Sequence, residues 1–250
     1  MRLEITTHVG CPVNCSDCPQ ALLKSKYTGR KTMRLEDYKK AIDKVPRECR
    51  IDFSGMCEPF VNPHCADMIL YAAEKGHPLA LYTTLQGATV SDWERLKDLR
   101  FEVVTIHIPD KNERSHFHIT ESYLDLLGRW ETNNYSCHGD IDDRVMPYLR
   151  PRNLITYVHD RAGNVVDRPH KTLRPDYPIR CATSGKAMNH NVLLPNGDVI
   201  MCCMDYGMTG LFGNLFTQTY DEVLNSPTAK AMRATLEKGE SICRHCTNAI

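Results

Sequence analysis

The sequence lacks the features that would point to a large binding partner. Lys plus Arg and Asp plus Glu both number 31 in 250 residues, so the formal net charge is zero. Such a balance gives no indication of nucleic acid or of an anionic membrane surface. No apolar run approaches the roughly 18 residues of a membrane span, and the opening MRLEITTH is not the apolar stretch of a signal peptide. We therefore expect a cytoplasmic protein that acts on small molecules.

The sequence also lacks repeats and low-complexity tracts, and its first 133 residues alternate between strand and helix patterns. Strand patterns cover 2–7, 50–54, 78–84 and 101–108, with weaker ones over 135–141 and 155–159. Helical stripes of apolar residues lie between them, and Ser91 with Glu94 forms a capping box that predicts the start of the third helix. The alternation predicts parallel βα units of an open or closed β/α barrel.

Alternation within the strands predicts two faces. Leu3, Ile5, Ile51, Phe53, Val104, Ile106 and Ile108 fall on one face, and Glu4, Thr6, His8, Asp52, Ser54, Thr105 and His107 fall on the other. In a β/α barrel the apolar face meets the helices, so the polar face would line the lumen. The alternative is a set of scattered polar residues satisfied within the core.

Cysteine is abundant, with 12 residues, and three of them lie in the segment CPVNCSDC as Cys11, Cys15 and Cys18. In a cytoplasmic chain such a cluster indicates metal binding more than disulfide formation. A structural zinc ion takes four ligands, whereas a 4Fe-4S cluster held by three thiolates keeps one iron open. The segment follows the first strand pattern, where a β/α barrel keeps its chemistry.

This C-x3-C-x2-C spacing after a first strand resembles the radical S-adenosylmethionine (SAM) superfamily. The resemblance implies a partial (β/α)6 barrel, in which the open iron binds the amino and carboxylate groups of SAM and an electron from the cluster releases a 5'-deoxyadenosyl radical. The residues after the second strand resemble that family's GGE-type segment for the SAM amino group; they are Gly55, Met56, Cys57, Glu58 and Pro59. Two departures are Cys57 in place of a glycine and Asp17 where an aromatic residue is common. Thr105 or His107 would stand near the SAM ribose.

The C-terminal part resembles the twitch form of the SPASM extension of radical SAM enzymes. The matching cysteines are Cys181, Cys202, Cys243 and Cys246, with Cys203 as an alternative to Cys202. Asn196-Gly197 predicts a hairpin turn and Ser226-Pro227 predicts a helix start. The resemblance implies a barrel over 1–180 and an auxiliary domain over 181–250 that holds a second, fully ligated 4Fe-4S cluster.

In size and layout the chain is similar to the aminocyclitol dehydrogenase of the twitch group. That similarity suggests a dehydrogenase that oxidises a sugar or cyclitol alcohol, with the auxiliary cluster as electron acceptor, His107 near the reacting groups and a flavodoxin or ferredoxin as reductant. One alternative is a radical epimerase of a sugar or peptide, in which Cys137 returns the hydrogen. Another is a non-catalytic iron-sulfur electron carrier.

The segment 144–180 is rich in cations, with eight Lys and Arg residues against three Asp residues. Because guanidinium groups match phosphate geometry, a nucleotide-linked or phosphorylated sugar is a possible substrate, with Arg150 and Arg152 as its ligands. The alternative is a solvated loop with ordinary ion pairs.

Overall fold

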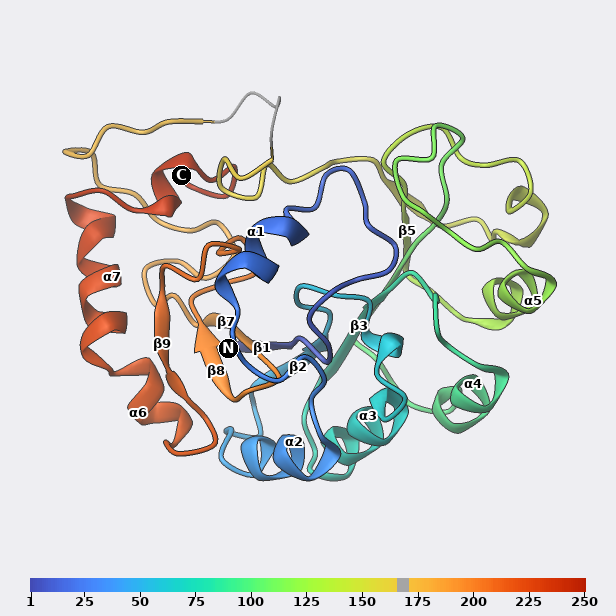
Figure 1. Ribbon diagram of the computed structural model, residues 1–250, viewed down its shortest axis with the longest axis horizontal. Coiled ribbons are helices and arrows are strands. Elements are labelled where there is room, and N and C mark those ends of the chain that lie inside the picture. Colours follow the sequence, from blue (N-terminus) through green and yellow to red (C-terminus); the bar gives the residue numbers. More distant parts are fainter. Residues whose placement is uncertain (166–170) are drawn as a thin grey trace.

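The computed structural model describes residues 1–165 and 171–250, and it contains one curved sheet with helices on its outer side (Figure 1). Six parallel strands follow the predicted order: β1 (Arg2–Ile5), β2 (Arg50–Phe53), β3 (Leu79–Thr83), β4 (Val103–His107), β5 (Asn134–Ser136) and β6 (Asn153–Ile155). Each pairs with its neighbour in parallel register. The partial parallel barrel predicted from the sequence is therefore confirmed.

Helices connect the parallel strands. They are α1 (Gln20–Lys26), α2 (Leu35–Ile42), α3 (Cys65–Glu74), α4 (Val90–Leu96) and α5 (Glu121–Arg129), with short 3-10 turns η1 (Pro59–Val61) and η2 (Met146–Tyr148). Helices α2 to α5 lie along the outside of the sheet, whereas α1 lies within its curve (Figure 1). The predicted cap of α4 is wrong by two residues. The capping box is formed by Thr89 and Asp92, whereas Glu94 pairs with Lys97 on the helix surface.

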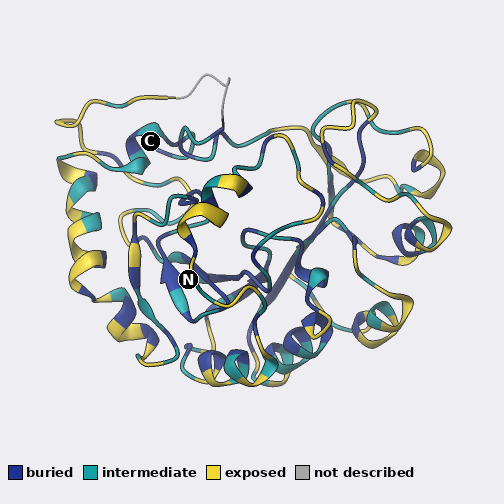
Figure 2. Ribbon diagram, viewed as in Figure 1, coloured by how far each residue is buried: buried dark blue, intermediate teal, exposed yellow. Residues whose placement is uncertain are grey.

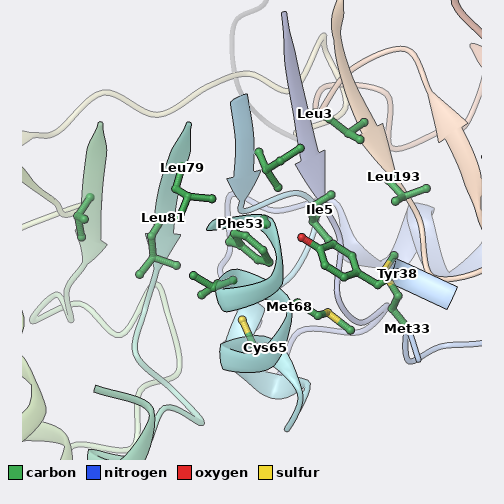
Figure 3. Close-up of a cluster of buried hydrophobic side chains, with 14 of the residues drawn as sticks. Leu3, Ile5, Met33, Tyr38, Phe53, Cys65, Met68, Leu79, Leu81 and Leu193 are labelled. Atoms are coloured by element: carbon green, nitrogen blue, oxygen red, sulfur yellow. The ribbon is translucent and has the colours of Figure 1, made fainter. Parts of the chain in front are cut away.

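The core lies between the outer face of the sheet and these helices. Leu3 and Ile5 of β1 and Phe53 of β2 are fully buried, and they pack with Tyr38 of α2 and Met68 of α3 (Figure 3). The helix faces toward solvent are exposed, while the strands are buried along most of their length (Figure 2). This arrangement confirms the predicted apolar face.

The C-terminal part extends the same sheet. Its elements are β7 (His190–Leu193), β8 (Asp198–Ile200), β9 (Leu211–Asn214), α6 (Tyr220–Leu224), α7 (Pro227–Glu237) and the 3-10 turn η3 (Ile242–His245). The predicted hairpin is present as antiparallel β7 and β8, and Ser226 caps α7 as expected. Strand β7 pairs in parallel with β1, giving the order β6-β5-β4-β3-β2-β1-β7-β8-β9. The hydrogen-bonded sheet thus crosses the predicted boundary at residue 180.

None of the helices in the described residues is both long and apolar enough to cross a membrane.

Candidate active site

A cavity of about 450 Å³ lies at the carboxyl ends of the parallel strands and is lined by both halves of the chain. All seven cysteines predicted as cluster ligands line it: Cys11, Cys15, Cys18, Cys181, Cys202, Cys243 and Cys246. Because residues 18 and 181 are far apart in the sequence, only the folded chain brings these two groups of thiols to one space.

The loop of Cys11, Cys15 and Cys18 follows β1 and is fixed by backbone hydrogen bonds. The amide of Ser16 donates to the carbonyl of Arg114 at 2.7 Å, and the amide of His116 donates to the carbonyl of Val13 at the same distance. These bonds tie the loop to the segment that follows β4. These two backbone hydrogen bonds therefore fix the path of the loop across the mouth of the barrel without any help from a cofactor.

The donors of this loop fit an iron-sulfur cluster. Its three thiols are partly buried and lie close enough to influence one another, because the charges of Cys11 and Cys18 raise the pKa of Cys15 along with burial. A 4Fe-4S cluster held by three thiolates keeps one iron open, whereas a structural zinc ion takes four ligands. Three thiols in one loop therefore fit the cluster better than the zinc ion.

The segment from Gly55 to Pro59 forms a tight turn beside this loop. Gly55 has a positive φ of 69°, and a Cβ there would lie 2.3 Å from the hydroxyl oxygen of Thr6. Cys57 hydrogen-bonds to Cys11, which lowers the pKa of the Cys11 thiol to about 6. Met56 is held by Thr6, whose hydroxyl accepts from the Met56 amide at 3.1 Å.

Glu58 holds this turn from within. Its carboxylate accepts hydrogen bonds from the hydroxyls of Thr83 and Thr84, both at 2.7 Å, and from the amides of Phe60 and Thr84. Burial raises the pKa of Glu58 to about 7 despite these bonds. Each oxygen of the Glu58 carboxylate already accepts two hydrogen bonds. We therefore expect Glu58 to position the turn, and we expect the backbone carbonyls of the turn to accept hydrogen bonds from an ammonium group.

Five of the seven polar strand residues predicted for the lumen line the cavity, whereas Thr6 and His8 do not. Glu4, Asp52, Ser54, Thr105 and His107 all line the cavity. Burial lowers the pKa of His107 to about 3 with a contribution from His138, so its imidazole is neutral at pH 7.

Glu4 and His190 form an ion pair at the floor of this lumen, with 2.7 Å between Oε1 and Nε2. Burial alone would raise the pKa of Glu4, but His190 holds it below the usual range. Burial alone would lower the pKa of His190, but Glu4 raises it above the usual value. The pair places a carboxylate and a protonatable imidazole together in the cavity.

The auxiliary cysteines come from three separate segments. Cys181 precedes β7, Cys202 follows β8, Cys243 lies within η3, and Cys246 directly follows η3. The charge of Cys243 acts on Cys202, whereas Cys203 faces Glu4 and Arg161. Both thiols line the cavity, so the assignment of Cys202 rather than Cys203 to the auxiliary group stays a prediction.

Two predicted catalytic residues lie away from the cavity. Cys137 is fully buried in the helix-side core, because the alternation after β5 turns Ser136 and His138 into the cavity and Cys137 away from it. Arg152 precedes β6 and so lies at the amino end of the strands, where its Nε donates to the carbonyl of Thr132 at 2.8 Å. Both assignments are corrected.

Arg150 is also at that end, paired with Glu131 at 2.9 Å. From the same cation-rich segment, Arg161 and Arg180 line the cavity instead, and Arg168 lies outside the described residues. Tyr206 and His190 also line the cavity and were not predicted. His190 opens a strand that the sequence presents only as a hairpin arm, and nothing near Tyr206 in the sequence marks it.

Comparison with known proteins gives one family match. Residues 181–247 match SPASM, an iron-sulfur cluster-binding domain. No curated protein matches the sequence. The C-terminal domain is therefore an iron-sulfur domain of the predicted kind.

Several solved structures share the fold. BtrN in complex with AdoMet and 2-DOIA has a TM-score of 0.69 at 16% identity, covering 99% of this chain and 92% of BtrN. Streptococcus suis SuiB bound to precursor peptide SuiA has a TM-score of 0.60 at 13% identity, covering 98% of this chain and 69% of SuiB. Native anSMEcpe with bound AdoMet has a TM-score of 0.56 at 12% identity, covering 98% and 86%. These structures share the fold of the chain, in which a partial parallel barrel is followed by the region that matches SPASM.

Proposed function

We propose that the chain is a radical SAM oxidoreductase that abstracts hydrogen from a small polar substrate and oxidises an alcohol carbon. The observation that carries this proposal is the single cavity lined by three thiols after β1 and four thiols from the SPASM region. AdoMet is named in the complexes of BtrN and anSMEcpe. When bound, the clusters and SAM would supply the radical that takes the hydrogen and an acceptor for the second electron.

The residues of the chain would hold and prepare the substrate. Cys11, Cys15 and Cys18 would hold the catalytic cluster, and the turn held by Glu58 would receive the SAM ammonium group. The carboxylate of Glu4 would accept the hydroxyl proton of a substrate seated in the lumen, because His190 already carries its own proton in the ion pair. Neutral His107 and Thr105 would hydrogen-bond to hydroxyl or ribose oxygens.

The substrate class follows from the lining of the cavity. A sugar or cyclitol suits the polar strand faces, and Arg161 with Arg180 would bind a phosphate of a nucleotide-linked or phosphorylated sugar in place of Arg150 and Arg152. BtrN is titled with a small molecule, 2-DOIA, and SuiB with a peptide. Each turnover also requires one electron at the catalytic cluster, which we assign to a flavodoxin or ferredoxin, and the electron taken from the substrate would leave through an acceptor of the same class.

The test is an anaerobic reaction with dithionite, SAM and candidate sugars. We expect 5'-deoxyadenosine and methionine, one SAM consumed per turnover and a product lighter by two hydrogens in mass spectrometry. A protein with both clusters bound that leaves SAM intact would be an electron carrier, contrary to the proposal.

One observation favours radical epimerisation as a second candidate. Cys203 lines the cavity beside Glu4, and with Cys202 as the cluster ligand the Cys203 thiol would be free to return a hydrogen atom to the substrate carbon. The resulting thiyl radical would then need one electron, from the ferredoxin or flavodoxin, and one proton. Turnover in heavy water distinguishes the two: epimerisation leaves one deuterium on carbon in a product that has lost no hydrogen, and Cys203→Ala abolishes it while Cys137→Ala does not.

A further inference from the structure

The loop after β8 carries a tyrosine to the other cysteine group. Tyr206 lies four residues beyond Cys202, and its hydroxyl oxygen is 3.3 Å from the sulfur of Cys18. The side chain is 2% exposed and packs in a buried cluster that includes Val9 and Met56. Tyr206, from the loop that carries Cys202, is thus in direct contact with Cys18, one of the three cysteines proposed to hold the catalytic cluster.

The path of this loop is fixed by Asp205. Its buried carboxylate accepts from the amide of Thr209 at 2.8 Å, from the Thr209 hydroxyl at 2.9 Å and from the amide of Gly210 at 2.7 Å. The amide of Asp205 donates to the carbonyl of Cys202 at 3.1 Å. Because these bonds close the loop on itself, Cys202 and Tyr206 are held in one rigid segment.

The tyrosine is also held from the side of the barrel. The guanidinium carbon of Arg161 lies 5.8 Å from the centre of the Tyr206 ring. On the Cys18 side, Nε2 of Gln20 lies 3.7 Å from the same sulfur and donates to the carbonyl of Met56. The sulfur of Cys18 therefore has two possible donors, one from its own loop and one from the SPASM region.

We propose that Tyr206 is a positioning residue that donates its hydroxyl hydrogen to the Cys18 thiolate and raises the reduction potential of the catalytic cluster. This inference rests on the proposed function, in that Cys18 must be a cluster ligand. A metal-bound thiolate carries no proton, so the tyrosine is the donor. Reduction adds negative charge to the cluster and its sulfurs, so a hydrogen bond to sulfur stabilises the reduced form.

The consequence is a link between the two metal sites. Any change in the loop of Cys202 would move Tyr206 and so alter the potential at Cys18. The geometry makes the catalytic site sensitive to whether the auxiliary loop is correctly folded, through one hydrogen bond.

The experiment is a potentiometric titration of the reconstituted protein, followed by electron paramagnetic resonance, with the catalytic signal identified by its response to SAM. Tyr206→Phe keeps the ring and removes the hydroxyl. We expect its reduced-to-oxidised ratio at a fixed potential to fall about tenfold, which corresponds to about 59 mV for one electron. Tyr220→Phe is the matched control. Tyr220 is equally buried, but its hydroxyl donates to Oδ1 of Asn191 at 3.2 Å and its side chain does not line the cavity that holds both cysteine groups.

A second variant keeps the inference testable if Tyr206→Phe binds less iron. Site-specific 3-fluorotyrosine at position 206 is a stronger donor and should move the potential in the opposite direction. An unchanged potential in both variants, with four irons on the catalytic loop, would overturn the inference. A shifted potential in a protein that does not cleave SAM would uphold it while refuting the proposed function.

Discussion

The two cysteine groups of this chain are built in opposite ways. Cys11, Cys15 and Cys18 lie within eight residues of one loop after β1, whereas the auxiliary cysteines come from segments spread over 181–246. The first group needs only one loop to be ordered. The second needs the hairpin, the turn η3 and the segment before β7 to pack together, so its formation is tied to the folding of the C-terminal part.

A buried arginine shows how strongly the second group depends on packing. Arg244, between Cys243 and Cys246, is fully buried and donates to the carbonyls of Gly239, Arg174, Tyr177 and Thr235 at 2.5 to 2.8 Å. These bonds join η3 to α7 and to the chain before Cys181.

The largest expected effect comes from deleting each group of thiols. The triple variant Cys11/Cys15/Cys18→Ala should lower bound iron from about eight to about four and abolish SAM cleavage, with thermal unfolding little changed. The variant Cys181/Cys243/Cys246→Ala should lose the same amount of iron but expose the C-terminal part to trypsin. Iron and sulfide analysis with limited proteolysis checks both. Equal protease resistance would show that the two groups do not differ as described.

Replacing Arg244 should disturb the auxiliary cysteine group but not the group of Cys11, Cys15 and Cys18, and it changes no thiol. Arg244→Met leaves four buried carbonyls without their donor, so we expect a loss of about 3 kcal/mol in unfolding free energy. Iron should fall toward about four per chain while SAM still binds. Arg129→Met is the control, because Arg129 is an exposed residue that pairs with Asp125 and lies over the ring of Trp93, and its replacement should cost less than about 1 kcal/mol. Chemical unfolding under anaerobic conditions measures both, and retention of all iron in Arg244→Met would contradict the comparison.

The pKa of Glu58 predicts how the stability of the protein depends on pH. Its pKa rises from 4.5 to about 7 on folding, so the folded state holds a proton that the unfolded state releases. Stability should therefore fall by up to about 3 kcal/mol as pH rises from 4.5 through 7.

In Glu58→Gln this part of the pH dependence should disappear, and SAM affinity should weaken about tenfold, because the amide group meets donors on Thr83 and Thr84. Thermal unfolding against pH and calorimetric SAM titration measure the two effects. Glu36→Gln, at an exposed site, should change neither. A pH profile identical to that of the wild type would rule out this role.

The smallest effects should come from the arginines at the amino end of the sheet. Arg150→Ala and Arg152→Ala should each cost less than about 1 kcal/mol and leave substrate affinity unchanged, since neither side chain lines the cavity. Arg161→Ala should weaken binding of an anionic substrate about tenfold. Substrate titration of the three variants gives the order, and a loss of affinity in Arg152→Ala would restore the original assignment.

The sequence alone determined the parallel strands, the two faces of each strand and both sets of cysteines. These features depend on local geometry: side chains alternate along any strand, and turn residues such as Asn196-Gly197 act over a few positions. The α4 cap was misplaced because two overlapping capping boxes, at Thr89 and at Ser91, compete over the same stretch, and local pattern does not rank them.

Only the tertiary structure decided which residues share the cavity. The pairing of β7 with β1 brings His190 to Glu4, and the fold of the loop after β8 brings Tyr206 to Cys18. The tertiary structure also keeps Cys137 and Arg152 out of the cavity. Cys137 follows β5 on the face that meets the helices, and Arg152 lies at the amino end of β6, away from the carboxyl ends that surround the cavity. Contacts between residues so distant in sequence arise from the packing of whole elements, and no local pattern of residue types encodes them.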